Sequence, residues 1–255
     1  ELSQKLKELL QKEMPLVEQF SIDEYFGDVT GYLEHDEVEE FARKLKQKIY
    51  DELKLPISIG IANTKYLSKL ITEYAKPDGI KYIPKDKIDS FIQDIDIKEF
   101  PGIGKGFQDK LHGYGIKTLG DIRKNKELFY KWKKPGIDLY NRVCGIRDNK
   151  LTLEREKKSI GIGRSFDPIY KREEIRRRVI ILSRYLCFLI KKAEVNPLTY
   201  AIKIKYEYKI KSKNYINVNR IFNEEDFKKA MAKLFDDNDI HPTHGVVQLN
   251  ITVSN

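Results

Sequence analysis

Residues 200–211 read YAIKIKYEYKIK, a run in which large apolar side chains alternate with charged ones. Successive side chains of a β-strand point to opposite faces of a sheet. One face of this strand would therefore carry Tyr200, Ile202, Ile204, Tyr206 and Tyr208. The other face would carry Lys203, Lys205, Glu207 and Lys209. The pattern predicts a sheet with one apolar face packed against helices and one basic face left open.

The segments around this run predict its neighbours in the sheet. They are a strand at 158–166, a helix at 171–194, strands at 198–208 and 213–221, a helix at 224–236 and a strand at 245–253. This β-α-β-β-α-β order is typical of the split βαβ, ferredoxin-like arrangement. The C-terminal hundred residues are therefore expected to form one domain.

Residues 1–83 show strand and helix signals in alternation. The expected elements are a helix at 2–12, a strand at 17–29, a helix at 34–53, a strand at 56–62, a helix at 64–74 and a strand at 80–83. This order indicates an α/β or α+β layer. Residues 84–147 have short helical pieces interrupted by Gly and Pro, which predicts a small all-helical domain. The polar residues 148–157 predict a linker.

Charge is distributed unevenly along the chain. The formal net charge of +9 comes from a segment of −6 at residues 1–96, one of +6 at 97–134 and one of +11 at 150–213, with −2 in the remaining residues. Such asymmetry suggests a nucleic-acid partner for the basic segments. The alternative is a protein from a Lys-rich proteome. Absence of any long apolar run argues against a membrane partner, and two lone cysteines favour a reducing, cytoplasmic location.

The first candidate site is Ser21-Ile22-Asp23-Glu24. Two carboxylates interrupt an apolar and aromatic strand, where unpaired charge is costly, so they are candidate metal ligands. The alternative is a pair of ordinary solvated acids, because acidic dipeptides are common. A second candidate is the lysine pair Lys65 and Lys69, followed by AKPDG at 75–79. Lysines here could receive phosphates, although the P-loop spacing is absent. The alternative is a solvated lysine face.

Two further motifs favour contact with a phosphate backbone. In the stretch FPGIGK at 100–105, a Gly-hydrophobic-Gly turn before a helix presents free backbone N–H groups, which is typical of a helix-hairpin-helix. The stretch KKSIGIGRSF at 157–166 combines cations with small residues on a predicted strand. The alternatives are a plain interhelical turn and a basic sheet face without a partner.

The four motifs, in this order, resemble the Y-family translesion DNA polymerases of the UmuC/DinB-like group. The resemblance runs from about Leu2 to Asn255 and implies an α+β protein. Its parts would be a partial polymerase palm at 1–83, a thumb with the helix-hairpin-helix at 84–147, a linker at 148–157 and a ferredoxin-like little finger at 158–255.

The resemblance also implies roles for particular residues. Asp23 and Glu24 correspond to catalytic carboxylates that help to hold two Mg²⁺ ions, and Lys76 corresponds to a lysine that contacts the incoming dNTP. Primer–template DNA would be bound by Gly102, Ile103, Gly104, Lys105, Lys157, Lys158, Ser159, Gly161 and Arg164. A sliding clamp is a further partner that the resemblance suggests.

The sequence departs from the family pattern at its N-terminus. In the family, a strand with a D-x-D-x-F-F/Y pattern and the fingers precede the helix in which Glu1 stands. We therefore expect this chain to be a fragment without the third carboxylate, which binds DNA but is inactive in nucleotidyl transfer. A second departure is Tyr25-Phe26, where a small residue often follows the acids.

The leading hypothesis is a DNA-directed DNA polymerase that extends primers past damaged bases. The alternative is a non-catalytic module that binds damaged DNA and retains only the thumb and little finger functions. An RNA-binding ferredoxin-like protein is disfavoured, because the C-terminal strands lack the paired aromatic pattern with which such proteins stack bases.

Overall fold

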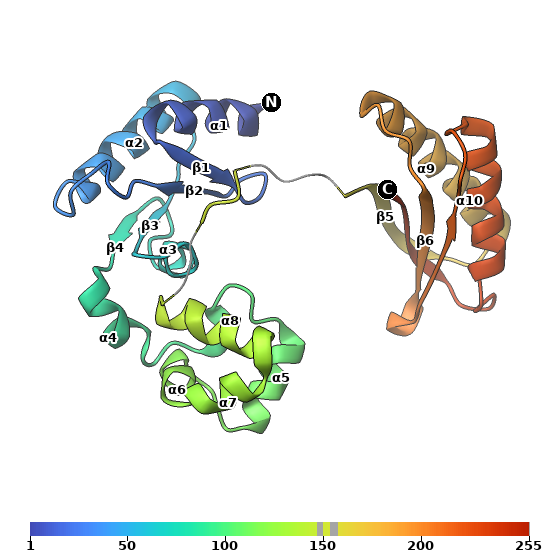
Figure 1. Ribbon diagram of the computed structural model, residues 1–255. Helices are drawn as coiled ribbons and strands as arrows, with labels where there is room; N and C mark the ends of the chain where they lie inside the picture. The colour runs from blue at the N-terminus through green and yellow to red at the C-terminus, as the bar shows by residue number, and fades with distance from the viewer. Residues whose placement is uncertain (147–149, 154–157, 255) are drawn as a thin grey trace. The chain divides into compact units, whose positions relative to one another are not determined.

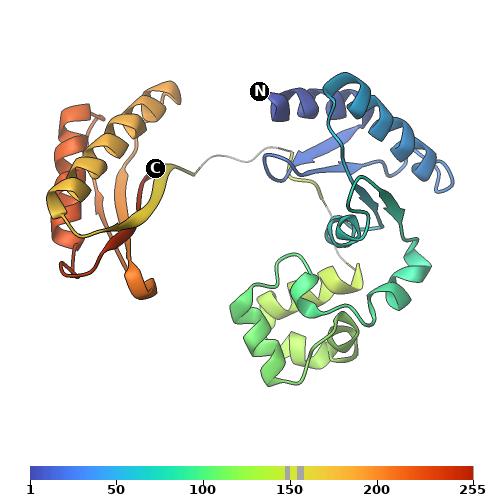
Figure 2. The same ribbon diagram turned by 180° about the vertical axis from the view of Figure 1, so that it is seen from behind.

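A computed structural model describes residues 1–146, 150–153 and 158–254. The chain divides into two compact units, residues 1–155 and 156–255, which are considered one at a time (Figures 1 and 2). Most of the predicted linker, including Lys157, lies outside the described residues. Among the described residues, no helix combines the length and the apolar character needed to cross a membrane.

The first unit combines two small sheets with helices. Its sheet elements are β1 (Leu16–Gln19), β2 (Tyr25–Asp28), β3 (Ile59–Ile61) and β4 (Ile80–Tyr82). The helices that precede β4 are α1 (Leu2–Glu13), α2 (Val38–Leu53) and α3 (Lys65–Glu73). Strands β1 and β2 pair antiparallel, and β3 pairs parallel with β4 across the α3 crossover.

The predicted single strand at 17–29 is wrong, because the chain turns back on itself there. β1 and β2 form a hairpin in which Gln19 lies opposite Tyr25. At the turn, the N–H groups of Phe20 and Ser21 both donate to the carbonyl of Glu24. The polar residues between Phe20 and Tyr25 favour a turn over continued strand, so Asp23 and Glu24 lie at a hairpin end and not within a strand.

The remainder of the first unit is helical, as the sequence predicts. Its elements are η1 (Lys85–Lys87), α4 (Ile88–Ile92), η2 (Ile97–Glu99), α5 (Lys105–Gly113), α6 (Leu119–Lys124), α7 (Lys126–Lys131) and α8 (Lys133–Cys144). Their buried side chains form one apolar core together with Leu67, Leu70 and Ile71 of α3. Helix α3 is therefore shared between the strand-containing part and the helical part of this unit.

The second unit has the predicted β-α-β-β-α-β order. Its elements are β5 (Ser159–Ile169), α9 (Arg172–Lys192), β6 (Thr199–Tyr206), η3 (Glu207–Lys209), β7 (Lys211–Asn217), α10 (Glu224–Asn238) and β8 (Val246–Ser254). The sheet order β5-β8-β6-β7 is antiparallel throughout and splits both βαβ units, since β8 lies between β5 and β6. This confirms the predicted arrangement.

One face of this sheet is covered and the other is open. Helices α9 and α10 lie together on one side of the four strands (Figures 1 and 2). Tyr200, Ile202, Ile204 and Tyr206 of β6 are buried beneath the helices, as the alternation predicts. The prediction for Tyr208 is wrong: β6 ends at Tyr206, and Tyr208 is 82% exposed in the 3₁₀ turn η3.

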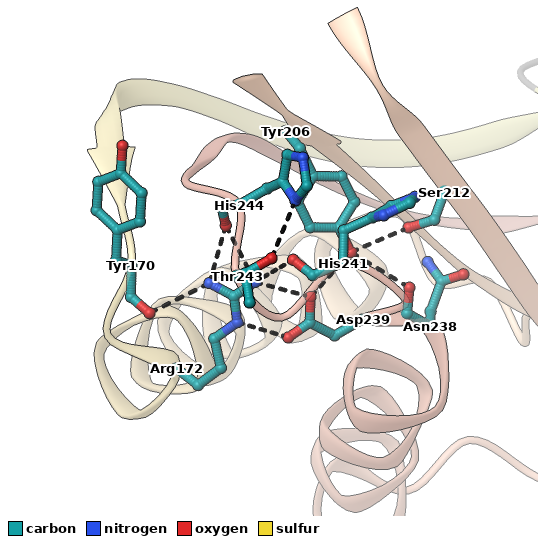
Figure 3. A network of polar contacts seen from close by, with 9 residues as sticks. All are labelled: Tyr170, Arg172, Tyr206, Ser212, Asn238, Asp239, His241, Thr243 and His244. Atoms are coloured by element: carbon teal, nitrogen blue, oxygen red, sulfur yellow. Dashed lines mark hydrogen bonds and ion pairs between the residues drawn. The ribbon is translucent and has the colours of Figure 1, made fainter. Parts of the chain in front are cut away.

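A partly buried ion network fixes the connection between α10 and β8 (Figure 3). The guanidinium of Arg172 pairs with Asp239 at 2.7 Å. It also donates to the backbone carbonyls of Tyr170, His241 and His244. Tyr206 donates its hydroxyl to Asp239 at 2.9 Å, and burial, followed by this neighbouring carboxylate, raises the pKa of Tyr206 to about 12. One cation thus satisfies a carboxylate and three carbonyl groups.

Replacing Arg172 with Ala is expected to destabilise the second unit by about 3 kcal/mol, because Asp239 and the carbonyls lose their common donor. The matched control is Arg176→Ala, one helical turn further along α9. Arg176 pairs with Asp236 at 3.0 Å, but both side chains are about half exposed, so the expected loss is below about 1 kcal/mol. Hydrogen exchange of α9 and α10 amides in urea measures both. Equal losses would contradict a special role for Arg172.

Candidate functional site

The hairpin turn of the first unit presents two adjacent carboxylates. Ser21 donates its hydroxyl to Asp23 Oδ1 at 2.6 Å. Glu24 forms an ion pair with Lys69 of α3. Asp23 is exposed and the Glu24 side chain is 42% exposed, so both are accessible from solvent. A hydrogen bond from Ser21 therefore holds Asp23 in the turn, and an ion pair with Lys69 holds Glu24.

A second ion pair fastens the same hairpin more deeply. The carboxylate of Glu18 in β1 has no exposed surface and accepts from Lys65 Nζ at 2.9 Å. Its Oε2 also accepts from the backbone N–H of Thr152, likewise at 2.9 Å. Lys65 and Lys69 stand one turn apart on α3 and both are engaged by hairpin carboxylates. A phosphate would have to displace these carboxylates to reach either lysine.

Helix α1 holds the turn from its other side. Ser3 donates its hydroxyl to the carbonyl of Ile22 at 2.5 Å. Tyr25 donates its own hydroxyl to the carbonyl of Ser3 at 2.7 Å, and Gln19 donates to the same tyrosine oxygen at 3.1 Å. The aromatic residue that departs from the family pattern thus anchors the hairpin to α1. No signal in the sequence pointed to this role.

Lys76 lies just beyond α3 and is also paired. Its Nζ contacts both carboxylate oxygens of Glu73, at 2.8 and 2.9 Å. Both side chains are about half exposed, so water screens this pair and it can exchange for another anion at little cost.

The carboxylates of the turn fit part of a magnesium site. Mg²⁺ is commonly bound through one or two carboxylates, with water and substrate phosphates completing the octahedron. Asp23 and Glu24 supply this minimum once Glu24 leaves Lys69. Within the described residues, no group of three or more His, Cys, Asp or Glu side chains is arranged to hold an ion. The site as described would depend on oxygens from elsewhere.

The loop before α5 offers backbone donors. Gly102 has φ +96°, which glycine adopts without strain, and Gly104 is the N-cap residue of α5. In the described part of the chain, the N–H groups of Gly104, Lys105 and Gly106 make no backbone hydrogen bond outside the helix, as is usual for the first turn. A Cβ at Gly104 would meet only open space, so a ligand can approach closely.

Ile103 differs from its neighbours in this loop. Its side chain is buried, with 5% exposed, and its N–H donates to the carbonyl of Phe100 at 3.1 Å. Ile103 therefore anchors the loop in the apolar core, whereas Gly102, Gly104 and Lys105 are exposed around it.

A hollow of about 520 Å³ joins this loop to α3. Its walls are Lys69, Glu73, Lys98, Glu99 and residues 100–104. Lys69 and Glu73 are the partners of Glu24 and Lys76, so two predicted sites border one hollow. Tyr74 donates its hydroxyl to Glu99 at 2.6 Å, and burial, reinforced by this contact, raises the pKa of Tyr74 to about 12. Lys98 is a lining cation that the motifs did not indicate.

At one end, the open sheet face of the second unit carries mostly small or polar side chains. The register aligns Ser159, Ser254, Thr199 and Asn217 in one row across the sheet. The next row contains Gly161, Thr252, Ala201 and Tyr215. A Cβ on Gly161 would lie 2.8 Å from Thr252 Oγ1, so the glycine lets β8 side chains lie over β5. Predicted residues Ser159 and Gly161 are therefore on the open face.

At the other end of this face stand four lysines, here called the lysine quartet: Lys203, Lys205, Lys211 and Lys213. Lys203 lies directly opposite Lys213, and Lys205 lies opposite Lys211. Like charges in direct cross-strand register destabilise a sheet. Within the described residues, none of the four forms an ion pair with a carboxylate. The alternation of β6 indicated Lys203 and Lys205, but the pairing with β7 was not predicted.

The basic residues of the KKSIGIGRSF stretch at 157–166 lie in different surroundings. Lys158 is exposed immediately before β5, whereas Lys157 lies outside the described residues. Arg164 lies opposite Leu249, which is buried beneath the helices. Arg164 is therefore on the helix-covered side of the sheet, whereas Ser159 is on the open side. Arg164 is exposed because β5 is an edge strand, and it donates to the carbonyl of Gly163.

Comparison with protein families gives matches over most of the chain. Residues 1–73 match the impB/mucB/samB family, residues 85–116 match the HHH motif of that family, and residues 157–255 match its C-terminal domain. The second match confirms the predicted helix-hairpin-helix.

Curated relatives and solved structures agree with these matches. The chain is 28% identical to DNA polymerase IV of Lactococcus lactis subsp. cremoris strain SK11, over 99% of the chain and 71% of that protein. It is 31% identical to DNA polymerase IV of Streptococcus gordonii, over 79% of the chain and 58% of that protein. The fold resembles a Y-family DNA polymerase chimera of Dbh and Dpo4, with a TM-score of 0.83, 23% identity and coverage of 100% and 75%.

Replacing Glu18 with Ala is expected to destabilise the first unit by about 3–5 kcal/mol, because Lys65 is left buried without its counter-charge. The matched substitution Glu24→Ala breaks a more exposed pair and should cost no more than about 1 kcal/mol. The single tryptophan, Trp132, lies in this unit, so its fluorescence during urea unfolding reports both variants. A loss for Glu24→Ala as large as that for Glu18→Ala would contradict the difference in burial.

Proposed function

Because the chain belongs to the impB/mucB/samB family of Y-family DNA polymerases, we propose that it binds primer–template DNA for nucleotidyl transfer past damaged bases. The relatives named DNA polymerase IV support this activity. A structural neighbour described as an insertion ternary complex of Dbh DNA polymerase, at a TM-score of 0.57 and 22% identity, shares the fold and no more.

The observation that carries the proposal is the lysine quartet on the open sheet face. Four cations in like-charge register raise the free energy of the unbound protein, and a polyanion removes this penalty. A DNA backbone offers regularly spaced phosphates and releases counterions when lysines neutralise it. The small residues of the adjoining rows, including Gly161 and Ala201, allow close approach. The same face bears Ser159, and Lys158 stands at its border.

The loop of the helix-hairpin-helix would hold a second stretch of backbone. The free N–H groups at the start of α5 suit one phosphate oxygen, independent of base sequence. Lys105 adds an exposed positive charge at the same place. Two separate backbone contacts, one in each unit, would be expected of a protein that follows a duplex without reading its sequence.

The acidic turn would serve the transfer step. We assign Asp23 and Glu24 to hold Mg²⁺, which when bound stabilises the charge on the transferring phosphate and activates the attacking hydroxyl. In this chain, Lys69 holds Glu24 until an ion competes for the carboxylate. Lys76 would exchange Glu73 for the triphosphate of an incoming dNTP. These residues would position the substrate. A sliding clamp is a further proposed partner.

The proposed domains follow the same assignment. Residues 1–83 would be the palm, 84–147 the thumb, 148–157 the linker and 158–255 the little finger. The apolar core that α3 shares with the helical part supports a thumb packed firmly on the palm. The two regions would then behave as one body at their boundary.

A non-catalytic DNA-binding module is the second candidate. The observation that favours it is that Glu24 and Lys76 are both engaged in ion pairs within the chain. Such pairs would be retained in a module that never binds metal or nucleotide. The two candidates share the sheet face and differ only at the acidic turn.

Neutralising one cross-strand pair with Lys203→Gln and Lys213→Gln is expected to weaken duplex binding on the order of tenfold at low salt. The slope of log affinity against log salt should fall by about 2, since two phosphate contacts are lost. Fluorescence anisotropy with a labelled duplex measures both quantities. The control is Lys229→Gln with Lys233→Gln, two exposed lysines of α10 on the covered side. An equal effect of the control would refute the assignment of the sheet face.

Replacing Asp23 with Asn and Glu24 with Gln, in the full reading frame that contains this sequence, should lower Mg²⁺-dependent primer extension by at least about a hundredfold. Duplex affinity should remain within about twofold, because these groups bind metal and not phosphate. If affinity falls as well, the acids are structural. If the unmodified frame binds duplex but does not extend primers, the non-catalytic module is the better account.

A further inference from the structure

The outer face of α9 carries a row of large apolar side chains that nothing in the described chain covers. Ile181, Tyr185 and Phe188 are 50%, 49% and 58% exposed, respectively. Their spacing of i, i+4 and i+7 places them in one line along the helix, here called the α9 stripe. The rings of Tyr185 and Phe188 are 6.1 Å apart between centroids, so they form a continuous surface.

The stripe is independent of the proposed DNA-binding face. Helix α9 packs on the sheet through Ile175, Val179, Leu182, Leu186 and Ile190, which are buried. The stripe lies on the opposite side of the helix from these residues, and the open sheet face lies on the opposite side of the sheet from α9. Ile181, Tyr185 and Phe188 are not among the buried core residues, and they make no phosphate contact on the open sheet face.

Basic residues dominate the segment that carries the stripe, although Arg177 and Arg178 pair with Glu174 and Lys191 pairs with Glu224. From Ile175 to Ala193 there is no acidic residue. The basic residues of this segment are Arg176, Arg177, Arg178, Arg184, Lys191 and Lys192. Arg184 lies beside the stripe and Lys192 at its end, and within the described residues neither forms an ion pair with a carboxylate. An acidic border on the partner would therefore complement Arg184 and Lys192.

The composition of the stripe favours a protein partner. Exposed Tyr, Phe and Arg clusters are enriched at the centres of protein interfaces, and an apolar row at i, i+4 and i+7 is the form in which a helix enters a groove. A second copy of this chain would oppose Arg184 with the same basic border. A lipid surface would require a broader apolar face than three side chains. The bases of a duplex are stacked and paired, so a duplex offers Ile181 and Phe188 no exposed base face.

We propose that the α9 stripe is a docking site for a protein that presents an apolar surface bordered by Asp and Glu. Tyr185 and Phe188 provide the apolar anchor, and Arg184 with Lys192 select the acidic border. The contact leaves the sheet face free, so the partner and DNA bind at the same time. This makes the second unit a bridge between nucleic acid and another protein, and the proposal does not depend on polymerase activity.

The test uses the whole chain labelled at isoleucine δ1 methyl groups and two helical model peptides. One peptide has a leucine face bordered by glutamate, and the other has the same leucine face bordered by lysine. The glutamate peptide is expected to shift the Ile181 methyl resonance, while Ile221 and Ile240, which are 86% and 61% exposed elsewhere, serve as internal controls. The lysine peptide should cause no shift.

Two variants keep the result specific. Tyr185→Ser with Phe188→Ser should weaken peptide binding at least about tenfold, and Arg184→Glu with Lys192→Glu should do the same through charge alone. All four side chains are exposed, and circular dichroism verifies that the variants remain folded.

Four outcomes would overturn the proposal. They are equal shifts with both peptides, an Ile181 shift that depends on protein concentration alone, a shift caused by anionic vesicles in place of the glutamate peptide, and a shift caused by duplex DNA. The second would indicate self-association, the third a lipid surface and the fourth a nucleic-acid contact.

Discussion

The buried ion pair between Glu18 and Lys65 is the constraint on which the first unit depends. It joins a hairpin, which alone is marginally stable in water, to a helix that is held in the apolar core. Once Lys65 is fixed, Lys69 follows one turn later and meets Glu24. The acidic turn is thus positioned by α3, and α3 also forms a wall of the hollow that the helix-hairpin-helix loop borders. Helix α3 therefore contacts both the acidic turn proposed for nucleotidyl transfer and the hollow beside the proposed backbone-binding loop.

The sequence predicted the second unit more completely than the first. Alternation in β6 and helical spacing in α9 and α10 are strong periodic signals, so the element order and the covered face were correct. The hairpin at 16–28 was missed because its two four-residue strands and the aromatic residues around them obscure the short turn. Tyr208 was misplaced because a 3₁₀ turn ends the strand, a feature that alternation alone does not reveal.

The sequence predicted the residues of the candidate sites but not the ion pairs that they form. The motifs identified Asp23, Glu24, Lys65, Lys69 and Lys76, yet each lysine proved to be paired with a carboxylate. The pairs of Lys65 and Lys69 join residues 47 and 45 positions apart, and no local pattern encodes them, whereas Lys76 pairs with Glu73 three positions before it. The same limit applies to the sheet face: the register of β6 with β7, which brings four lysines together, depends on a tertiary pairing. Arg164 illustrates the converse, because it lies five positions after Ser159 in an uninterrupted register, so simple alternation already places the two residues on opposite faces.

The lysine quartet couples the folding of the second unit to its ionic surroundings. Without a partner, mutual repulsion among four closely spaced ammonium groups works against the sheet, and added salt relieves that repulsion by screening. The same salt weakens attraction to phosphates. A rise in ionic strength therefore stabilises the folded state of this unit and at the same time weakens its binding of nucleic acid. Nucleic acid takes the place of salt when it binds, so the bound unit is also the more stable one.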